Sequence, residues 1–326
     1  MTPEQARLGA LVRFASGITI LTIFGHAILG FETSILQLLV CVAVTYSAEL
    51  VMEIVGAWSE DRKPAFVGGG LKRLVIFLLP AHITGFAIAM LIYPGDRLLP
   101  FAYAGLMAIT SKSIFSVVSR GRRRHFLNPS NFGIVATIFV FPSTTLAPPY
   151  EFTENIVGIW DWALPALFIC IGTFINYRFT KKLPLIATWL TAFCLQAVVR
   201  YYLFPPTSIF TTLAPLTGVP FLLYTFYMIT DPQTSPSSVR GQIIFGLSIA
   251  AAYMCLLVLH VVFTLFVALF VVCVGRGIML YVCELASFQR VQASAERLWL
   301  TFYGRPSPLT GVPATSGDMM ERFTRS

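Results

Sequence analysis

Apolar runs of about 20 residues recur along this 326-residue chain and limit what it can fold into. About 20 mostly apolar residues are what an α-helix needs to cross a bilayer. Inside a bilayer the backbone must satisfy its own hydrogen bonds, so these runs are expected to be helical. The composition agrees, because 56% of the residues are hydrophobic and only 12% are charged. The sequence therefore predicts an all-α polytopic membrane protein without a separate soluble domain.

We expect about ten spans, with both termini in the cytoplasm. The apolar runs lie at 11–31, 34–58, 74–93, 99–118, 131–145, 156–177, 184–204, 209–230, 242–258 and 261–283. Residues 1–283 then form the transmembrane domain. Residues 284–326 form a cytoplasmic tail with an amphipathic segment and a disordered end. The predicted location is the bacterial inner membrane.

The basic residues support this orientation, because Lys and Arg accumulate in cytoplasmic loops. With the amino terminus inside, only Arg97 and Arg200 fall on the outer side, and Arg276 is counted with the tail. The basic run from Arg122 to His125 lies between two predicted spans and has no interleaved aromatic residues. We interpret it as a topology-setting loop that contacts anionic lipid, and we expect no nucleic-acid partner.

Two polar turns have the pattern of a helix start. Asn128 is followed by Pro129, and Asp231 is followed by Pro232. Asn and Asp side chains cap free backbone N–H groups, and Pro is tolerated at the first helical position. Helix N-termini attract anions, so both turns are candidate ligand sites on the cytoplasmic face. The alternative is that both turns are ordinary loops between spans.

Ionisable residues inside the spans are costly and are therefore functional candidates. Lys112 interrupts the fourth span, where its ammonium either reaches the cytoplasmic headgroups or faces an anionic or reducible ligand beside the Asn128 turn. Glu49 and Glu53 share one face of the second span. They form either a cation or proton relay or, alternatively, ion pairs, with Glu53 beside Arg62.

The histidines and cysteines do not form a metal-binding pattern. His26 and His82 lie in predicted spans, and a bis-histidine haem site built from His82 and His260 stays an alternative. The six cysteines are scattered singly through apolar runs, and we interpret them as small buried hydrophobic side chains. The chain has no hydrolytic or phosphate-loop motif, so we predict no catalytic and no metal-ligating residue.

Two stretches resemble the RnfD/NqrB family of membrane redox subunits. Residues 82–142 carry the family's Thr-Gly pair, Pro turn, Ala-Ile-x-x-Lys element, Phe-Asn-Pro turn with a later Gly, and closing Phe-Pro. Residues 215–246 carry its Thr-Asp-Pro-x-Thr-Ser-Pro turn, followed by Arg-Gly and a further Gly. The matching positions are Thr84, Gly85, Pro94, Ala108, Ile109, Lys112, Phe126, Asn128, Pro129, Gly133, Phe141 and Pro142, then Thr230, Asp231, Pro232, Thr234, Ser235, Pro236, Arg240, Gly241 and Gly246. The amino-terminal part and the compact length are most similar to the UnbU-type proteins associated with enediyne biosynthesis.

The resemblance implies a fold of ten spans in two halves and a function in electron transfer. It implies a subunit of a membrane oxidoreductase that binds flavin among its helices and associates with other membrane or redox subunits. The expected cofactor-binding residues are Lys112, Asn128, Pro129, Thr230, Asp231 and Thr234. In this hypothesis Asn128 and Thr230 supply hydrogen bonds to the ligand, and Lys112 stabilises negative charge on the reduced ring.

The loop at residues 143–155 departs from the family, whose redox subunits carry FMN on a Thr in a Ser-Gly-Ala-Thr-like motif. That motif is absent here, although Thr144, Thr145 and Thr153 remain as hydroxyl groups. We therefore expect noncovalent FMN or riboflavin, a quinone, or no cofactor. Two alternatives stay open: a channel or transporter for a small molecule or ion, and an accessory protein of enediyne-type biosynthesis.

Overall fold

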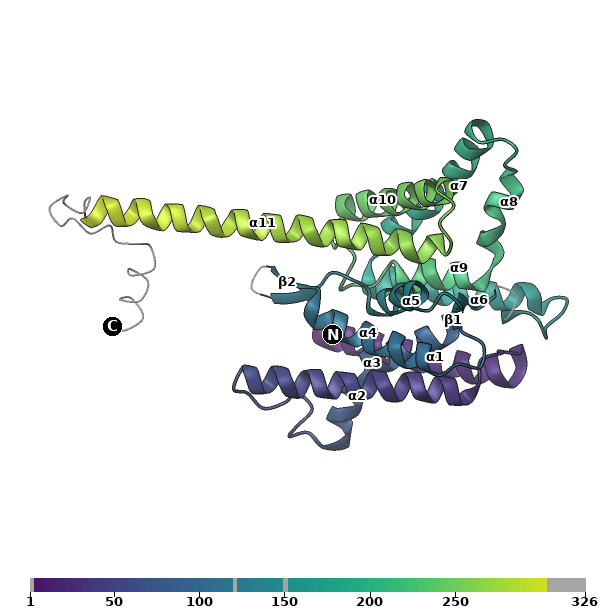
Figure 1. The fold of residues 1–326 in the computed structure, drawn as a ribbon, viewed down its shortest axis with the longest axis horizontal. Coiled ribbons are helices and arrows are strands. Elements are labelled where there is room, and N and C mark those ends of the chain that lie inside the picture. Colours follow the sequence, from purple (N-terminus) through teal and green to yellow (C-terminus); the bar gives the residue numbers. More distant parts are fainter. Residues whose placement is uncertain (1–2, 120–121, 149–151, 304–326) are drawn as a thin grey trace. The chain divides into compact units, whose positions relative to one another are not determined.

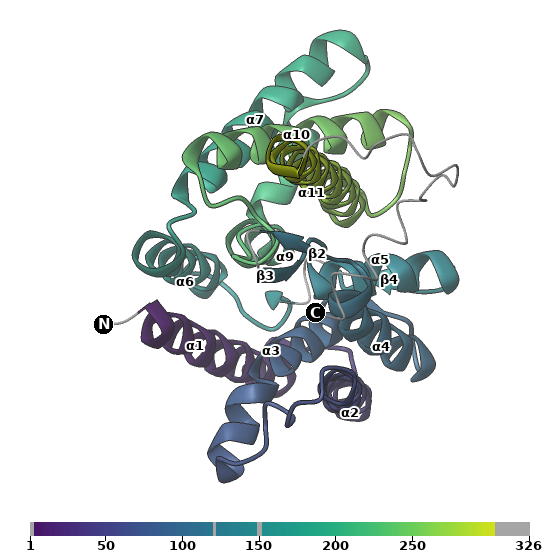
Figure 2. The same ribbon diagram turned by 90° about the vertical axis from the view of Figure 1, so that its left-hand side faces the viewer.

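The computed structural model describes residues 3–119, 122–148 and 152–303. The chain divides into two compact units, Met1–Leu280 and Tyr281–Ser326. All contacts discussed below belong to the first unit, a bundle of helices shown in Figure 1 and Figure 2. The tail predicted at 284–326 is helical through Tyr303, and its remainder lies outside the described residues.

The amino-terminal half contains helices joined by two short antiparallel strand pairs. The helices are α1 (Pro3–Phe24), continued by the π-helical segment η1 (Gly25–Leu29), α2 (Ile35–Ser59), α3 (Gly70–Leu91), α4 (Leu99–Ile114) and α5 (Pro129–Val140). Strand β1 (Ile92–Tyr93) pairs with β4 (Thr145–Leu146), and β2 (Ser116–Ser119) pairs with β3 (Arg122–His125). The β2–β3 hairpin connects α4 to α5, whereas β1–β4 pairing joins the segments that follow α3 and α5.

The carboxyl-terminal half is helical and contains several short or irregular segments. These are α6 (Trp160–Ile175) with η3 (Asn176–Thr180), α7 (Leu183–Leu203), α8 (Ile209–Leu213) with η4 (Ala214–Thr217), α9 (Val219–Leu223) with η5 (Tyr224–Met228), α10 (Val239–Val258) and α11 (Thr264–Tyr303). The segments η3 and η5 are π-helical, and η4 is a 3-10 helix.

Among the described residues, seven helices are long and apolar enough to cross a membrane. The segments Ile209–Thr217 and Val219–Met228 form a pair bent by 72°, which gives eight spans if the pair counts as one. The described residues thus support seven or eight of the roughly ten expected spans. Helix α4 has 16 residues and α5 has 12, fewer than the roughly 20 that a crossing needs. The structure is that of an all-α, multi-pass membrane protein by helix length and hydropathy.

Proline explains two of these departures from regular spans. Helix α5 begins at Pro129 and ends at Val140, shortly before Pro142. The proline ring disfavours helical backbone angles in the residue that precedes it, here Phe141. The bent pair breaks at Gly218, between Pro215 and Pro220, whose rings lack the backbone N–H that a continuous helix needs.

The predicted helix start at Asn128 is confirmed. Its side chain accepts a hydrogen bond from the Asn131 N–H at 3.0 Å, and Pro129 occupies the first turn of α5. This arrangement satisfies one of the free N–H groups at the helix N-terminus.

The predicted helix start at Asp231 is wrong. Helix α10 begins at Val239, and its cap is Ser238, whose hydroxyl accepts from the Gly241 N–H at 3.2 Å. The Asp231 carboxylate instead accepts from the Gln233 N–H at 3.2 Å and closes a local turn. Aspartate favours such turns as readily as helix caps, which explains the error.

Small residues allow neighbouring helices to approach closely. A Cβ atom added to Gly133 would lie 2.5 Å from the carbonyl oxygen of Ala104, so α5 packs directly against the α4 backbone. A Cβ atom added to Gly246 would lie 3.2 Å from the carbonyl oxygen of Leu185, so α10 also packs closely against the α7 backbone. Packing through small residues is typical of helices in membranes.

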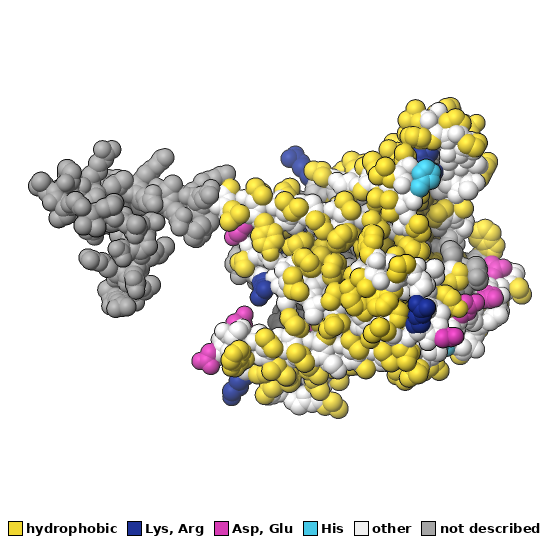
Figure 3. Space-filling model, in the orientation of Figure 1, with side chains coloured by type: hydrophobic (Ala, Val, Ile, Leu, Met, Phe, Trp, Pro, Cys, Tyr) yellow, Lys and Arg dark blue, Asp and Glu magenta, His cyan; other side chains and the backbone are white. Residues whose placement is uncertain are grey.

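The surface of the first unit suits a bilayer. Figure 3 shows hydrophobic side chains over the visible flank, with charged side chains mostly toward the ends of the helices. Of the cysteines, Cys41 and Cys273 are buried as expected, but the other four are exposed on the isolated chain. The expectation that all six are buried is therefore wrong, because a span hides only one stripe of its surface from lipid.

Candidate functional site

The two turn-bearing stretches of the sequence meet in space. The Nδ2 of Asn128 donates to the carbonyl oxygen of Met228 at 3.2 Å and so joins the start of α5 to the end of η5. The Oδ1 of the same side chain accepts from the Asn131 N–H at 3.0 Å and from the Ser130 hydroxyl at 2.9 Å. Asn128 is buried, so these internal bonds replace contact with water.

Three other expected site residues, Thr230, Asp231 and Thr234, also form hydrogen bonds within the protein. The Thr230 hydroxyl donates to the Phe226 carbonyl oxygen at 2.7 Å, and the Thr234 hydroxyl donates to the Asp231 carboxylate at 3.0 Å. Thr230 and Thr234 are buried, whereas Asp231 is half-buried. The donors that were expected to bind a ligand, Asn128 and Thr230, are thus engaged inside the protein.

Two cations hold the backbone of this turn. The Lys182 ammonium donates to the carbonyl oxygens of Ser235 at 3.3 Å and Pro236 at 2.6 Å. The Arg276 guanidinium donates to the carbonyl oxygen of Thr234 at 2.8 Å. Lys182 precedes α7 and is only 3% exposed, and Arg276 lies in α11. The structure therefore corrects the assignment of Arg276 to the tail, since the span that contains it runs over Thr264–Ala286.

Positive charge is in excess around this turn. Burial lowers the pKa of Lys182 to about 8, the Asp231 carboxylate opposes that shift, and the Arg276 charge adds to it. Arg124, in β3, also acts electrostatically on Arg276. We name Arg124, Lys182 and Arg276 the basic cluster. None of the described ion pairs includes any of the three.

Lys112 belongs to a different part of the bundle. Its ammonium lies 2.7 Å from the Glu49 carboxylate, which joins α4 to α2. Both side chains are about one-sixth exposed, at 17% and 16%. The described partner of Lys112 is thus a carboxylate of α2 and not a group of the Asn128 turn.

The structure shows both glutamates in ion pairs. Glu49 is paired with Lys112, and the Glu53 carboxylate lies 2.5 Å from the Arg62 guanidinium. Both ring nitrogens of His82 lie at hydrogen-bond distance from hydroxyl groups, and His260 is exposed, so the structure does not favour the haem alternative. Among the described residues, no group of three or more His, Cys, Asp or Glu side chains is placed to hold a metal ion.

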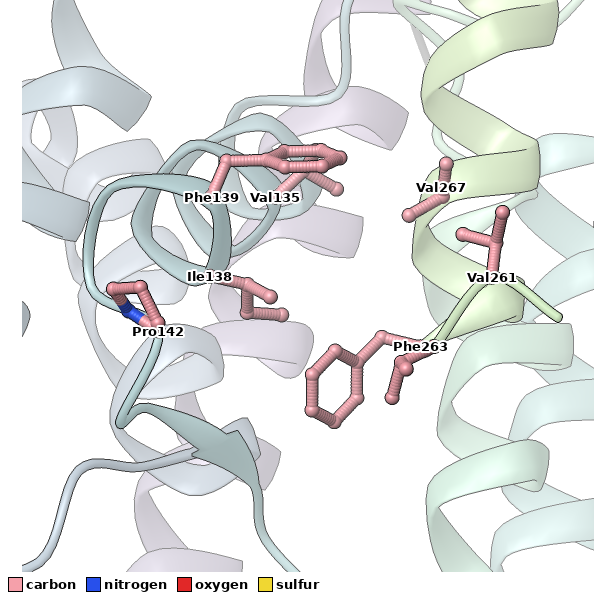
Figure 4. Close-up of a pocket in the computed structure, with 8 residues that line it drawn as sticks. Val135, Ile138, Phe139, Pro142, Val261, Phe263 and Val267 are labelled. Carbon is pink, nitrogen blue, oxygen red and sulfur yellow. The ribbon is translucent and has the colours of Figure 1, made fainter.

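A cavity of about 260 Å³ lies between the second half of α5 and the segment that leads into α11. Figure 4 shows Ile138 and Phe139 of α5 directed toward Phe263 and Val267 on the opposite side. Every lining residue is apolar, which suits a hydrocarbon chain better than a flavin ring with its polar edge. None of the expected site residues lines this cavity.

Lys182 and Arg276 are the site residues that sequence reasoning missed. Arg276 carried a usable signal, because it is a charge inside an apolar run, whereas Lys182 was indistinguishable from other loop cations. No family model matches the chain, and no curated protein matches it. The resemblance to the RnfD/NqrB family therefore stays a prediction.

Proposed function

We propose that this chain is an integral membrane electron-transfer subunit that binds a flavin or a quinone noncovalently within a larger redox complex. One observation carries the proposal beyond the sequence resemblance. The two stretches that resemble the family, about a hundred residues apart, are hydrogen bonded through Asn128 and Met228 beside the basic cluster.

The charge balance of the basic cluster favours an anionic ligand. Asp231 is the carboxylate that acts on Lys182, and it accompanies three cations. The lowered pKa of Lys182 means that burial disfavours its ammonium. An anion beside Lys182 would stabilise that ammonium and raise the pKa again. The N-terminus of α5 adds a smaller attraction for negative charge.

FMN and reduced flavins fit this charge, because FMN carries a phosphate and the reduced ring is anionic. When bound, a flavin supplies reversible electron transfer that the chain's own side chains lack. The residues that would hold it are Arg124, Lys182 and Arg276, while Asn128 and Thr230 keep the two turns in place. The expected role of Lys112 changes accordingly, from contact with the ring to an ion pair with Glu49.

The first test is an absorbance and fluorescence spectrum of the detergent-purified protein before and after acid denaturation. Flavin released on denaturation is the expected result, and quinone extraction tests the second ligand class. Flavin that stays with the chain would contradict noncovalent binding and direct attention to Thr144, Thr145 and Thr153. Protein that contains neither ligand when freshly prepared would refute the redox proposal.

The second test locates the site. Lys182→Gln and Arg276→Gln each remove one positive charge from the basic cluster, so each is expected to lower flavin occupancy several-fold. Lys63→Gln removes the same charge from an exposed loop and serves as the matched control. Equal occupancy in all three variants would place the ligand elsewhere on the chain.

A transporter for a small molecule or ion is the second candidate. It is favoured by the pair bent by 72° at Gly218 and by the 12-residue helix α5, because broken and short helices are typical of transporter sites. Solute flux into proteoliposomes made from protein without flavin or quinone would support this candidate. An absence of flux would leave the accessory role in a biosynthetic complex.

A further inference from the structure

A chain of polar side chains connects α1, α2 and α3 near the middle of these helices. The Thr19 hydroxyl donates to the Ala15 carbonyl oxygen at 2.8 Å and lies 2.7 Å from Nε2 of His82. The Tyr46 hydroxyl lies 2.7 Å from Nδ1 of the same ring. Thr19, Tyr46 and His82 are each half-buried.

The direction of these hydrogen bonds follows from counting protons. Thr19 has one hydroxyl proton, and the Ala15 carbonyl accepts it. The Thr19 oxygen must therefore accept the proton that His82 carries on Nε2. In a neutral imidazole Nδ1 then has no proton and accepts from the Tyr46 hydroxyl. The hydrogen bonds run from Tyr46 through His82 and Thr19 to Ala15.

This row of hydrogen-bonded side chains has one closed end and one open end for proton transfer. It closes at the Ala15 carbonyl oxygen, which accepts a hydrogen bond but has no proton to pass on. It opens at Tyr46, because Tyr46, Glu49 and Glu53 follow one another at spacings of three and four residues on one face of α2. Glu53 lies in the last two turns of α2 and contacts Arg62 in the loop beyond. A proton that enters through Tyr46 therefore stops at His82.

We propose that His82 is a proton-loading site, filled from the predicted cytoplasmic face along Glu53, Glu49 and Tyr46. In the loading step Tyr46 transfers its hydroxyl proton to Nδ1 of His82 and takes one proton from a hydronium ion on the Glu49 side. One proton enters, no electron moves, and the imidazole becomes an imidazolium. Unloading reverses the same step, since the Thr19 end is closed.

The pair between Glu49 and Lys112 controls this loading. Among the side chains that the structure describes, the elements packed against α3 carry Arg13 on α1, Cys41, Tyr46, Glu49 and Glu53 on α2, and Tyr103 and Lys112 on α4. His26 lies on η1, directly after α1; α5 carries no titratable side chain, and α3 itself adds Lys72 and Arg73 at its start. Of these groups, Glu49 is the carboxylate one turn from Tyr46, and Lys112 neutralises it at 2.7 Å. Lys112 and a protonated His82 thus compete for one negative charge.

The test is the titration of His82, followed by ¹⁵N NMR of histidine-labelled protein in detergent. The chain has four histidines, and the His82→Gln spectrum assigns the signal. At high pH we expect the tautomer with its proton on Nε2. Lys112→Met leaves Glu49 unpaired and is expected to raise the titration midpoint by about one pH unit, a tenfold gain in proton affinity. Glu49→Gln leaves Lys112 unpaired and is expected to lower the midpoint by a similar amount.

Lys72→Met is the matched control, because it removes the same charge from an exposed position at the start of α3 and is expected to leave the midpoint unchanged. If His82 only joins the three helices by hydrogen bonds, its titration midpoint should not shift in any of these variants. Unchanged midpoints, or a high-pH tautomer with its proton on Nδ1, would overturn the proposal. If Glu49→Gln does not fold, Lys112→Met alone decides. The titration needs no flavin or quinone, so its outcome is independent of the proposed function.

Discussion

The hydrogen bond between Asn128 and Met228 can be separated from the capping of α5 by two substitutions at one position. Asn128→Ser keeps a good helix cap but is too short to reach the Met228 carbonyl oxygen. Asn128→Ala removes both interactions. Because Met228 also accepts a longer bond of 3.4 Å from the Asp231 N–H, its oxygen is not left wholly unpaired in either variant.

The magnitudes follow from the two interactions. A buried hydrogen bond contributes about 1 kcal/mol net, and loss of a helix cap costs about 1 kcal/mol. We therefore expect Asn128→Ser to lower the free energy of unfolding by about 1 kcal/mol and Asn128→Ala by about 2 kcal/mol. Ser238→Ala removes only the cap of α10 and is the matched control, with an expected loss of about 1 kcal/mol.

The assay is unfolding in mixed detergent micelles with increasing SDS, followed by tryptophan fluorescence. Trp189 is fully buried and reports loss of the packed core. Wild-type stability in Asn128→Ser would show that the bond between the two turns contributes nothing. Equal stability of the Ser and Ala variants would show that the cap contributes nothing.

Three further predictions concern charge and packing. The pKa of Lys182 is about 8 in the folded protein and 10.5 ordinarily, so the unfolded chain binds more protons between these pH values. The free energy of unfolding should therefore rise with pH from about 8 to 10.5. Lys182→Met should abolish this rise in unfolding curves measured at different pH values. Gly133→Val should cost about 1–3 kcal/mol, whereas Gly275→Ala, with open space around it, should be neutral or slightly stabilising in the same assay. The double variant Glu49→Gln/Lys112→Met should lose less stability than the sum of the losses in the two single variants, by a coupling energy of about 1–3 kcal/mol in a double-mutant cycle. Additive losses would contradict the ion pair.

Local signals predicted what local interactions decide. The cap at Asn128 was predictable because the cap, the proline and the capped N–H lie within four residues. The same reasoning failed at Asp231, because an Asx turn and a helix cap use the same carboxylate and adjoining backbone N–H groups. The choice between them depends on the residues that follow, where Ser238 provides the cap.

The number of spans was only partly predictable. Apolar length alone did not distinguish a crossing helix from α5, which is apolar but has 12 residues. Hydropathy shows that a segment avoids water but does not show whether it crosses the bilayer. A short helix buried in the protein and a helix that faces lipid are therefore both apolar and look alike in the sequence. The bend at Gly218 was marked by its flanking prolines, yet an apolar run of 209–230 still reads as one span.

The contacts of the candidate site depended on long-range packing. Lys112 and Glu49 are 63 residues apart, and Asn128 and Met228 are 100 apart, so no local pattern connects either pair. Lys182 donates to a turn more than 50 residues away. Which charges meet is decided by how the helices stack, and a single sequence does not report that.

The bent pair has a consequence for how the protein is assembled in the membrane. Phe210, in α8, is 87% exposed, whereas Phe221 and Tyr224, beyond the bend, are 2% and 1% exposed. The first segment of the pair, Ile209–Thr217, can therefore contact lipid as soon as it leaves the insertion machinery. The second segment, Val219–Met228, has an irregular backbone that only neighbouring helices can accommodate. We expect it to settle into place after α10 and α11 have been made, so the order of synthesis and the order of packing differ in this half of the chain.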